Sequence, residues 1–493
     1  MKIKRFKVNR EIMDVLTRVQ GLLEQRDVEG YLTGGFIRDA MMGRDSNDVD
    51  IVVGAPAMEV ARDIADALEG RFVPLDEANE IARVVFLGEN PLHIDVATMR
   101  GSISDDLALR DFTVDAMAIE LKHISDRGTS VIDPYGGQQD LRAGIVRSIS
   151  EGAFQRDPAR LLRALRLAAE CGFSIESETL KQIARHHQLI TQVAAERIRD
   201  EFCLLLAVPR ANRWLHLLDE LGLLMAVLPE LSACRGAEQP KEHFWDVLDH
   251  SIETVGTIEF LLRISDSEYF GEEILAVAPW SPQLEGYFEE TVASDHQRKT
   301  LLKIAGLLHD IAKPQTRTIE EGGRMRFFGH SEEGTAIAQG IMERLRFSSR
   351  ECEMVSRMIE YHLRPGQLAR DAEMPTKRAI YRYFRDSGDV GIDIIFLNLA
   401  DHLAARGPMM ELEKWCEHAE AMAYVIDKRF GEEDIVAPPK LISGHDLVDT
   451  LGMSPGPEVG RLLEAVREAQ AAGEVNTKEE ALQFVRKHRP ALS

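Results

Sequence analysis

Hydrophobic and polar positions along the chain follow two different periods. Residues 1–29 carry apolar side chains at helical spacing, which predicts an opening helix. Between residue 30 and about residue 137, short apolar runs typical of strands stand between helical stretches. The expected strands are Gly30–Thr33, Val49–Val53, Ile81–Phe86 and His93–Ala97, and the clearest helix is Ala57–Leu68. This alternation predicts an α/β head that ends near a turn at residues 133–137.

After residue 140 the period is almost entirely helical. Long amphipathic runs are separated by prolines, and the composition changes near residues 228–230 and 436–439. A chain of 493 residues is also too long for a single core. We therefore expect an α+β protein in four parts: a head at 1–139, a helical neck and body at 140–228, a helical domain at 229–435 and a helical tail at 436–493.

The composition is that of a soluble globular protein, with 44% hydrophobic and 29% charged residues. No apolar run approaches the length of a membrane span, and no apolar stretch follows the basic segment Met1–Lys7. We therefore expect neither a membrane anchor nor a secretory signal. The five cysteines are scattered and odd in number, which indicates reduced thiols and a cytoplasmic location.

The net charge of −23 argues against an RNA partner when it is taken alone. The charge is unevenly distributed, however. Residues 156–213 are rich in arginine, whereas acidic residues concentrate at 265–291 and toward the C-terminus. Because an acidic protein can bind RNA through one basic surface, the net charge does not exclude a nucleic-acid substrate.

The double glycine Gly34–Gly35, followed by Asp48 and Asp50, is the most specific chemical signal in the chain. Residues i and i+2 of a strand point to one face, so the two carboxylates converge. Backbone at a glycine can approach phosphates closely. The combination predicts a Mg²⁺ site for a nucleoside triphosphate. The alternative is a glycine-rich turn before an ordinary strand.

The motifs GGFIRD at 34–39 and DVD at 48–50 resemble the nucleotidyltransferase superfamily of the DNA polymerase β type, in its class II branch. That branch contains the tRNA CCA-adding enzymes and the bacterial poly(A) polymerases. The resemblance implies that Gly34, Gly35 and Arg38 bind the triphosphate, and that Asp48 and Asp50 are catalytic and hold two Mg²⁺ ions. Asp95 is the candidate for a third catalytic carboxylate; a strand aspartate capped by local N–H groups is the alternative.

Residues 106–116, DLALRDFTVDA, resemble the family signature that contacts triphosphate and ribose. The resemblance assigns Arg110, Asp111 and Asp115 to nucleotide binding. Two positions depart from the family pattern, since Leu109 stands where an arginine is usual and Asp115 where asparagine is common. The preceding segment Gly101–Asp105 resembles, in a short form, the mobile loop that links C and A addition in CCA-adding enzymes.

The sequence RDPAR at 156–160 opens a predicted helix and resembles the amino-acid template of the class II enzymes. In that family an Asp and an Arg bond the Watson–Crick edge of the incoming base, so that CTP and ATP are accepted. Asp157 and Arg160 match those two positions, although Arg156 stands where glutamate is usual. Arg163 and Arg166 follow at helical spacing and complete the expected nucleotide-binding set. A capped helix with a basic face is the alternative.

Six further residues match, in chain order, the metal ligands of the HD superfamily: His250, His309, Asp310, His330, His362 and Asp401. A single histidine on a helix is usually structural, but a full set in this order is rarely coincidental. His330 and His362, which follow the adjacent His-Asp pair, stand at the positions where hydrolytic HD members bind a second metal. The resemblance implies a site for a divalent metal of unspecified identity and a phosphohydrolase activity.

Together, these motifs imply a CCA tRNA nucleotidyltransferase that transfers CMP and AMP from CTP and ATP to the 3′ end of tRNA without a nucleic-acid template. The implied architecture is a polymerase-β-like head, an all-α neck and body, an HD domain and a helical tail that supports tRNA. A partial enzyme that adds only CC or only A, and a poly(A) polymerase, share every motif and remain open. A further alternative is an HD phosphohydrolase whose head only binds nucleotide or RNA.

Overall fold

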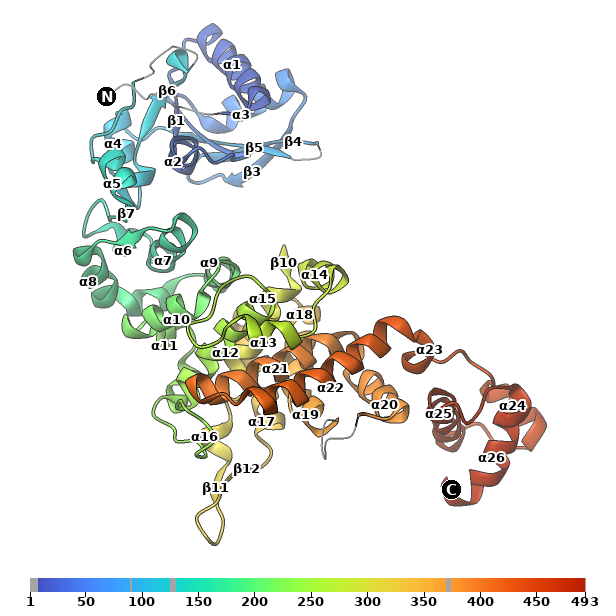
Figure 1. Cartoon of the computed structure of the whole chain (residues 1–493). Helices are drawn as coiled ribbons and strands as arrows, with labels where there is room; N and C mark the ends of the chain where they lie inside the picture. The colour runs from blue at the N-terminus through green and yellow to red at the C-terminus, as the bar shows by residue number, and fades with distance from the viewer. Residues whose placement is uncertain (1–7, 89–90, 125–129, 369–373, 493) are drawn as a thin grey trace. The chain divides into compact units, whose positions relative to one another are not determined.

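The computed structural model describes residues 8–88, 91–124, 130–368 and 374–492 (Figure 1). The chain divides into two compact units. The first comprises Met1–Leu205 and Glu220–Ala226, and the second comprises Leu206–Asp219 and Val227–Ser493. The expected division into four parts at 139, 228 and 435 is finer than this and stays a prediction.

A mixed sheet of six strands forms the head of the first unit, in the order β3-β4-β5-β2-β1-β6. Only β2 and β5 pair in parallel; the other neighbours are antiparallel. The strands are β1 Gly30–Thr33, β2 Asp48–Val53, β3 Arg71–Asp76, β4 Ile81–Phe86, β5 Leu92–Thr98 and β6 Ala118–Glu120. Strands β1 and β4 have the predicted bounds, whereas β2 and β5 extend slightly beyond the apolar runs that predicted them.

Helices α1 (Arg10–Gln25) and α3 (Ala57–Leu68) bury their apolar faces in one core with the sheet. This core contains Leu16 and Ile64 from the helices, and Ile51 and Ile94 from the central strands, each at most 1% exposed. Buried side chains of this size contribute roughly 1.5–3 kcal/mol each to stability. Helix α2 (Gly34–Met42) follows β1 without an intervening loop, which fixes the position of the double glycine.

Short helices carry the remaining motifs of the first unit. They are α4 Ile103–Leu107, η1 Thr113–Asp115, η2 Leu121–His123, α5 Gly137–Ala143, α6 Ala153–Arg156, α7 Arg160–Cys171, α8 Ser177–His186, η3 His187–Gln192, α9 Ala195–Ala207 and α11 Leu223–Val227, with the strand pair β7 Ile145–Val146 and β8 Ser174–Ile175. The segment Gly101–Asp105, which resembles a mobile loop, contains the N-cap Ser102 and the first turn of α4. Ser102 and Asp105 form a reciprocal capping box that satisfies the helix N-terminus.

The second unit is helical, as predicted. Its helices are α10 Ala211–Glu220, η4 Pro229–Cys234, α12 Val247–Leu261, α13 Glu272–Val277, α14 Pro282–Glu289, α15 Arg298–Leu308, α16 Lys313–Thr316, α17 His330–Arg344, α18 Ser349–Tyr361, α19 Arg364–Leu368, α20 Lys377–Ser387, η6 Gly388–Val390, α21 Gly391–Arg406, η7 Gly407–Met409, α22 Leu412–Gly431, α23 Glu433–Val436, α24 Gly444–Leu451, α25 Pro457–Ala471 and α26 Lys478–Leu492. Two short hairpins, β9 Thr291–Ala293 with β10 His296–Gln297 and β11 Arg317–Ile319 with β12 Met325–Phe327, interrupt them.

Helices α12, α15, α18 and α21 pack against one another at the centre of the second unit (Figure 1). Helices α12, α15 and α21 are buried on nearly all sides, which is typical of a central helix. Polar side chains on such helices must find partners or ligands. No helix among the described residues is both long and apolar enough to cross a membrane.

Candidate functional site

The double-glycine turn lies directly against one of the predicted catalytic carboxylates. Gly34 has a φ of +69°, in the left-handed region that favours glycine, and a Cβ at this position would overlap the Asp50 carboxylate. Thr33, the last residue of β1, is the register partner of Asp50 on β2. The backbone that the sequence assigns to phosphate binding and the carboxylate that it assigns to metal binding are therefore neighbours.

Four register partners form a row across the adjacent strands β1, β2, β5 and β4: Thr33, Asp50, Asp95 and Arg83. Asp50 and Asp95 lie side by side. Burial raises the pKa of Asp50 to about 6, although Arg110 opposes the shift. Burial thus disfavours the charged form of Asp50, and a bound cation would favour it.

Asp48 lies two residues before Asp50 on the same strand, and its side chain is 76% exposed. The Nδ1 of His93, its register partner on β5, is 3.1 Å from the Asp48 carboxylate. Asp48, Asp50 and Asp95 thus offer oxygen ligands on adjacent strands, next to a glycine whose side-chain space is filled by Asp50. Carboxylate oxygens suit Mg²⁺, so these residues fit the ion that the motifs imply.

Arg110 and Asp111 lie beside this row. Arg110 donates to the Thr33 hydroxyl at 3.1 Å and pairs with Asp106 at 3.4 Å. Asp111 is buried and pairs with Arg163 of α7 at 3.1 Å. Burial opposes the charge of Asp111, but Arg163 and Arg160 hold the pKa of its carboxyl below the usual value. These residues, predicted from two separate motifs, therefore belong to one charged network.

Asp115 takes a different position in the same network. It is buried and receives a hydrogen bond of 2.6 Å from Arg38, while its second oxygen, Oδ2, has no hydrogen-bond partner among the described residues. Burial raises the pKa of Asp115, and Arg38 opposes the shift. Arg38 also donates twice to Asp39 at 3.0 Å, so two carboxylates neutralise its guanidinium.

The residues predicted to read the base lie at the start of α7. Asp157 accepts two hydrogen bonds from Arg197, at 3.0 and 2.8 Å. Arg160 donates to the carbonyl oxygen of Leu109 at 2.8 Å and to that of Arg110 at 3.4 Å. These contacts fix both side chains before a nucleotide arrives.

Arg166 differs from the other predicted arginines. Its guanidinium pairs with Glu170 at 2.8 Å and with Glu201 of α9 at 2.6 Å, and its side chain is only 16% exposed. The contact with Glu201 joins α7 to α9, whereas Glu170 lies on α7 itself, so we assign Arg166 to holding these two helices together. It is left out of the nucleotide site that we propose below.

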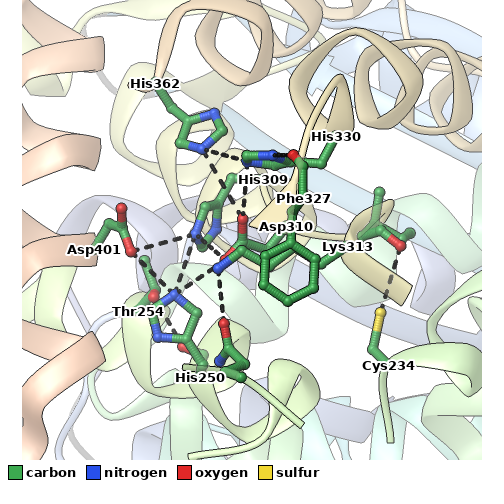
Figure 2. Close-up of polar contacts among 12 residues, drawn as sticks. Cys234, His250, Thr254, His309, Asp310, Lys313, Phe327, His330, His362 and Asp401 are labelled. Atoms are coloured by element: carbon green, nitrogen blue, oxygen red, sulfur yellow. Dashed lines mark hydrogen bonds and ion pairs between the residues drawn. The ribbon is translucent and has the colours of Figure 1, made fainter. Parts of the chain in front are cut away.

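The six residues predicted as HD ligands meet in the core of the second unit, as Figure 2 shows. One group contains His250, His309, Asp310 and Asp401, and the other contains Asp310, His330 and His362; in each group the candidate ligand atoms lie within 4.8 Å of one another. Asp310 belongs to both groups, so its two oxygens face two sets of histidines. Five of the six residues are buried, and Asp401 is half-buried.

In three of these histidines, Nδ1 contacts a backbone carbonyl oxygen and Nε2 faces the carboxylates. Nδ1 of His309, His330 and His362 lies 2.7–2.8 Å from the backbone carbonyl oxygens of Gly306, Phe327 and Ile359. A carbonyl oxygen can only accept, so each Nδ1 carries a proton, and in the neutral ring Nε2 is then the nitrogen with the lone pair that can bind a metal. Carbonyl-bound Nδ1 is the usual arrangement around protein metal sites.

The Nε2 atoms face carboxylate oxygens, and the nearby Asp310 and Asp401 raise the pKa of His309 to about 10 despite its burial. The Nε2 of His309 is 3.2 Å from one Asp310 oxygen, and the Nε2 of His330 is 3.5 Å from the other. A metal ion can replace a proton between such a nitrogen and a carboxylate oxygen, and mixed imidazole and carboxylate ligands suit a transition metal. The residues present therefore fit a divalent metal centre, with Asp310 placed to serve two ions.

Two residues near these sites were not predicted. Lys313, three residues after Asp310, pairs with it at 2.5 Å and also donates to Gln239 at 2.7 Å. Arg83 binds Asp95 with two hydrogen bonds, at 2.7 and 2.9 Å. The spacing of the motif HDIAK could have revealed Lys313, whereas Arg83 was visible only as a lone charge in an otherwise apolar strand.

Family models match four consecutive stretches of the chain. They are a "Poly A polymerase head domain" at 30–147, a "Probable RNA and SrmB- binding site of polymerase A" at 172–234, an "HD domain" at 247–406 and a tRNA nucleotidyltransferase domain 2 at 409–485. Together these matches cover the sheet of the head, helices α8–α11, the histidine cluster and most of the C-terminal helices, whereas α7 lies between two of them.

Two curated relatives match nearly the whole chain. An A-adding tRNA nucleotidyltransferase of Deinococcus radiodurans is 33% identical over 470 residues, which cover 92% of this chain and 94% of the relative. A CC-adding tRNA nucleotidyltransferase of Thermus thermophilus is 32% identical over 465 residues, 93% of each chain.

Solved structures of CCA-adding enzymes share the fold. The Thermotoga maritima enzyme complexed with tRNA superposes with a TM-score of 0.64 at 20% identity, over 99% of this chain and 98% of that one. A CCA-adding enzyme complexed with CTP gives a TM-score of 0.66 at 19% identity, over 99% of both chains. The resemblance inferred from the motifs and the α+β architecture are both confirmed. The chain belongs to the tRNA nucleotidyltransferase family of CCA-adding enzymes and their CC-adding and A-adding relatives, and it carries an HD domain.

Proposed function

We propose that the head adds nucleotides to the 3′ end of tRNA, using CTP and ATP. The observation that carries this proposal is the contact of Gly34 with Asp50, in the row that also contains Asp95. Asp48, Asp50 and Asp95 would hold Mg²⁺, which supplies charge stabilisation for attack of a hydroxyl on the α-phosphate and for release of pyrophosphate. The backbone of Gly34 and Gly35 and the side chain of Arg110 bind the triphosphate.

We further propose that Asp157 and Arg160 select the base without a nucleic-acid template. Arg197 orients Asp157, and the carbonyl groups of residues 109 and 110 orient Arg160. Asp111 and Arg163 link this pair to the row of carboxylates, since they connect residues 110–115 to helix α7. Arg38 acts through Asp115, whose free oxygen Oδ2 is a candidate acceptor for a ribose hydroxyl.

Complete CCA addition and partial addition are both supported as the final product. The solved structures that share the fold are named CCA-adding enzymes, whereas four relatives aligned over about nine-tenths of the chain are named A-adding or CC-adding. Transcripts of tRNA that end at the discriminator base, at C and at CC decide between them. Completion of CCA on all three shows the full activity, and extension of only some shows a partial enzyme. Long A tails would show that the protein is a poly(A) polymerase and would refute both complete and partial CCA addition.

For the HD domain we propose metal-dependent hydrolysis of phosphoesters. The converging imidazole and carboxylate ligands support it, and Lys313 beside Asp310 is placed to contact an anionic substrate. Two variants separate the activities. Asp48→Ala should abolish nucleotide addition and keep hydrolysis of bis(p-nitrophenyl) phosphate with Mn²⁺ or Ni²⁺. Asp310→Asn should abolish this hydrolysis and keep nucleotide addition. Nucleotide addition that survives Asp48→Ala would refute the proposed role of the head.

A further inference from the structure

Arg83 is the last residue in the row of register partners Thr33, Asp50, Asp95 and Arg83, but it belongs to none of the family motifs quoted above. We propose that Arg83 is a positioning residue that orients Asp95 and competes with the divalent ion for its carboxylate. This inference rests on the proposed function of the head, because Asp95 is assigned there to the Mg²⁺ site.

The pairing of strands brings Arg83 and Asp95 together. They are direct partners in the antiparallel pair of β4 and β5, and Asp95 is the direct partner of Asp50 in the parallel pair of β5 and β2. Neighbouring partners across a sheet project from the same face. Arg83 is therefore next in line after the two carboxylates, on the side away from Thr33.

The contact occupies both oxygens of Asp95. The Nε of Arg83 binds Oδ1 at 2.7 Å, and its Nη2 binds Oδ2 at 2.9 Å. Such a forked pair is the strongest and most directional that a carboxylate can form with a side chain. Asp95 can therefore ligate a metal ion only if the arginine gives up or shares an oxygen.

The charges along the row support the same conclusion. The Asp95 carboxylate binds the Arg83 guanidinium, and Asp48 and Asp50 lie on the adjacent strand β2. On the far side of Asp50, Arg110 donates to Thr33. The carboxylates thus lie between two arginines, and Arg83 supplies positive charge beside Asp95, the proposed metal ligand. Removing it leaves the carboxylates with less compensation and a stronger demand for a cation.

The test compares Arg83→Gln with Arg62→Gln. Arg62 lies on α3, over the Phe72 ring at 4.8 Å, so its variant removes the same charge from the head without touching Asp95. Every protein, including the parent, also carries Asp310→Asn to weaken metal binding in the HD domain. Binding of Mn²⁺ to the full chain is followed by the EPR signal of the free ion, without nucleotide or RNA.

We expect Arg83→Gln to bind Mn²⁺ about three- to tenfold more tightly than the parent, because a unit charge beside a ligand is lost. Arg62→Gln should leave the affinity unchanged. In the addition assay Arg83→Gln should lower both the Mg²⁺ concentration that gives half-maximal rate and the maximal rate, since Asp95 is then free but poorly oriented. Arg83→Lys should keep the positive charge but lose the orientation of Asp95, because a lysine cannot form the two parallel hydrogen bonds.

A double-mutant cycle with Asp95→Asn separates a contact from a general charge effect. If Arg83 acts through Asp95, Arg83→Gln changes the Mn²⁺ affinity much less when Asp95 is already Asn. An unchanged or weakened Mn²⁺ affinity in a cooperatively folded Arg83→Gln protein overturns the inference. The Mn²⁺ measurement needs no tRNA, so failure of the parent to add nucleotides would count against the proposed function and not against this contact.

Discussion

Replacing Gly34 with alanine tests the contact on which the head site depends. The backbone at this position has a φ of +69°, which costs an alanine roughly 1 kcal/mol or more. The added Cβ would also overlap the Asp50 carboxylate, and its Cγ would lie 3.1 Å away. Either Asp50 or the turn must therefore move, and both belong to the proposed catalytic site.

Gly43 provides a matched control. It ends helix α2 with a φ of +74°, and nothing lies within 4 Å of the position that a Cβ would occupy. Both alanine variants should lose about 1 kcal/mol of unfolding free energy from the backbone alone. Only Gly34→Ala displaces Asp50, the proposed metal ligand, and a misplacement of about 1 Å can reduce a catalysed rate by about 100-fold.

The assay measures single-nucleotide extension of a tRNA transcript that the parent protein extends (one that ends at the discriminator base, at C or at CC), with saturating CTP, ATP and Mg²⁺, alongside urea unfolding. We expect Gly43→Ala to retain most of its activity and Gly34→Ala to retain about 1%. If both variants lose stability equally and keep the same rate, the contact with Asp50 has no catalytic meaning and the argument for the head site fails.

Four other predictions address the remaining contacts. Lys303→Met should cost about 3 kcal/mol in urea unfolding, because it leaves the buried Glu259 carboxylate without its cation, and a second change of Glu259 to leucine should restore part of the loss. His216→Gln should lower the free energy of unfolding most at low pH, because the hydrogen bond to Glu253 raises the pKa of His216. The stabilisation by protonated His216, at most about 1 kcal/mol after solvent screening, is complete below pH 6.5 and is lost as the pH rises through the folded-state pKa. Arg197→Ala should raise misincorporation of GTP or UTP about tenfold in single-turnover assays, since it frees the carboxylate that we assign to base reading. Treatment with a chelator should lower the thermal midpoint of the parent protein by several degrees and leave that of the Asp310→Asn variant nearly unchanged, because an ion bound to the folded HD core adds to stability.

Local patterns predicted the elements of the head well. The strand at Ile81–Phe86 and the helix at Ala57–Leu68 have the bounds that hydrophobic periodicity indicates, since burial on one face dictates which residues are apolar. Periodicity does not specify which strand pairs with which, so the contact of Arg83 with Asp95 could not be predicted. Pairing depends on the whole sheet.

Motif order was informative about which residues meet, and less so about what each one does. The HD ligands converge as their order predicted. Arg166, at helical spacing from Arg160, was expected to bind nucleotide, but Glu201, far away in the sequence, binds its guanidinium. A motif identifies a chemical group and its approximate place, whereas competing partners from distant segments decide whether that group is available to a ligand.

The row of Thr33, Asp50, Asp95 and Arg83 has a consequence for how this protein can be made and can evolve. Each member lies on a different strand, and shifting any strand by one residue turns its member to the opposite face. Insertions or deletions of a single residue inside these strands should therefore be eliminated by selection, while loops between them can vary in length. During synthesis, the row cannot assemble until β5, which ends at Thr98, has left the ribosome. No shorter nascent fragment can therefore begin nucleotide transfer.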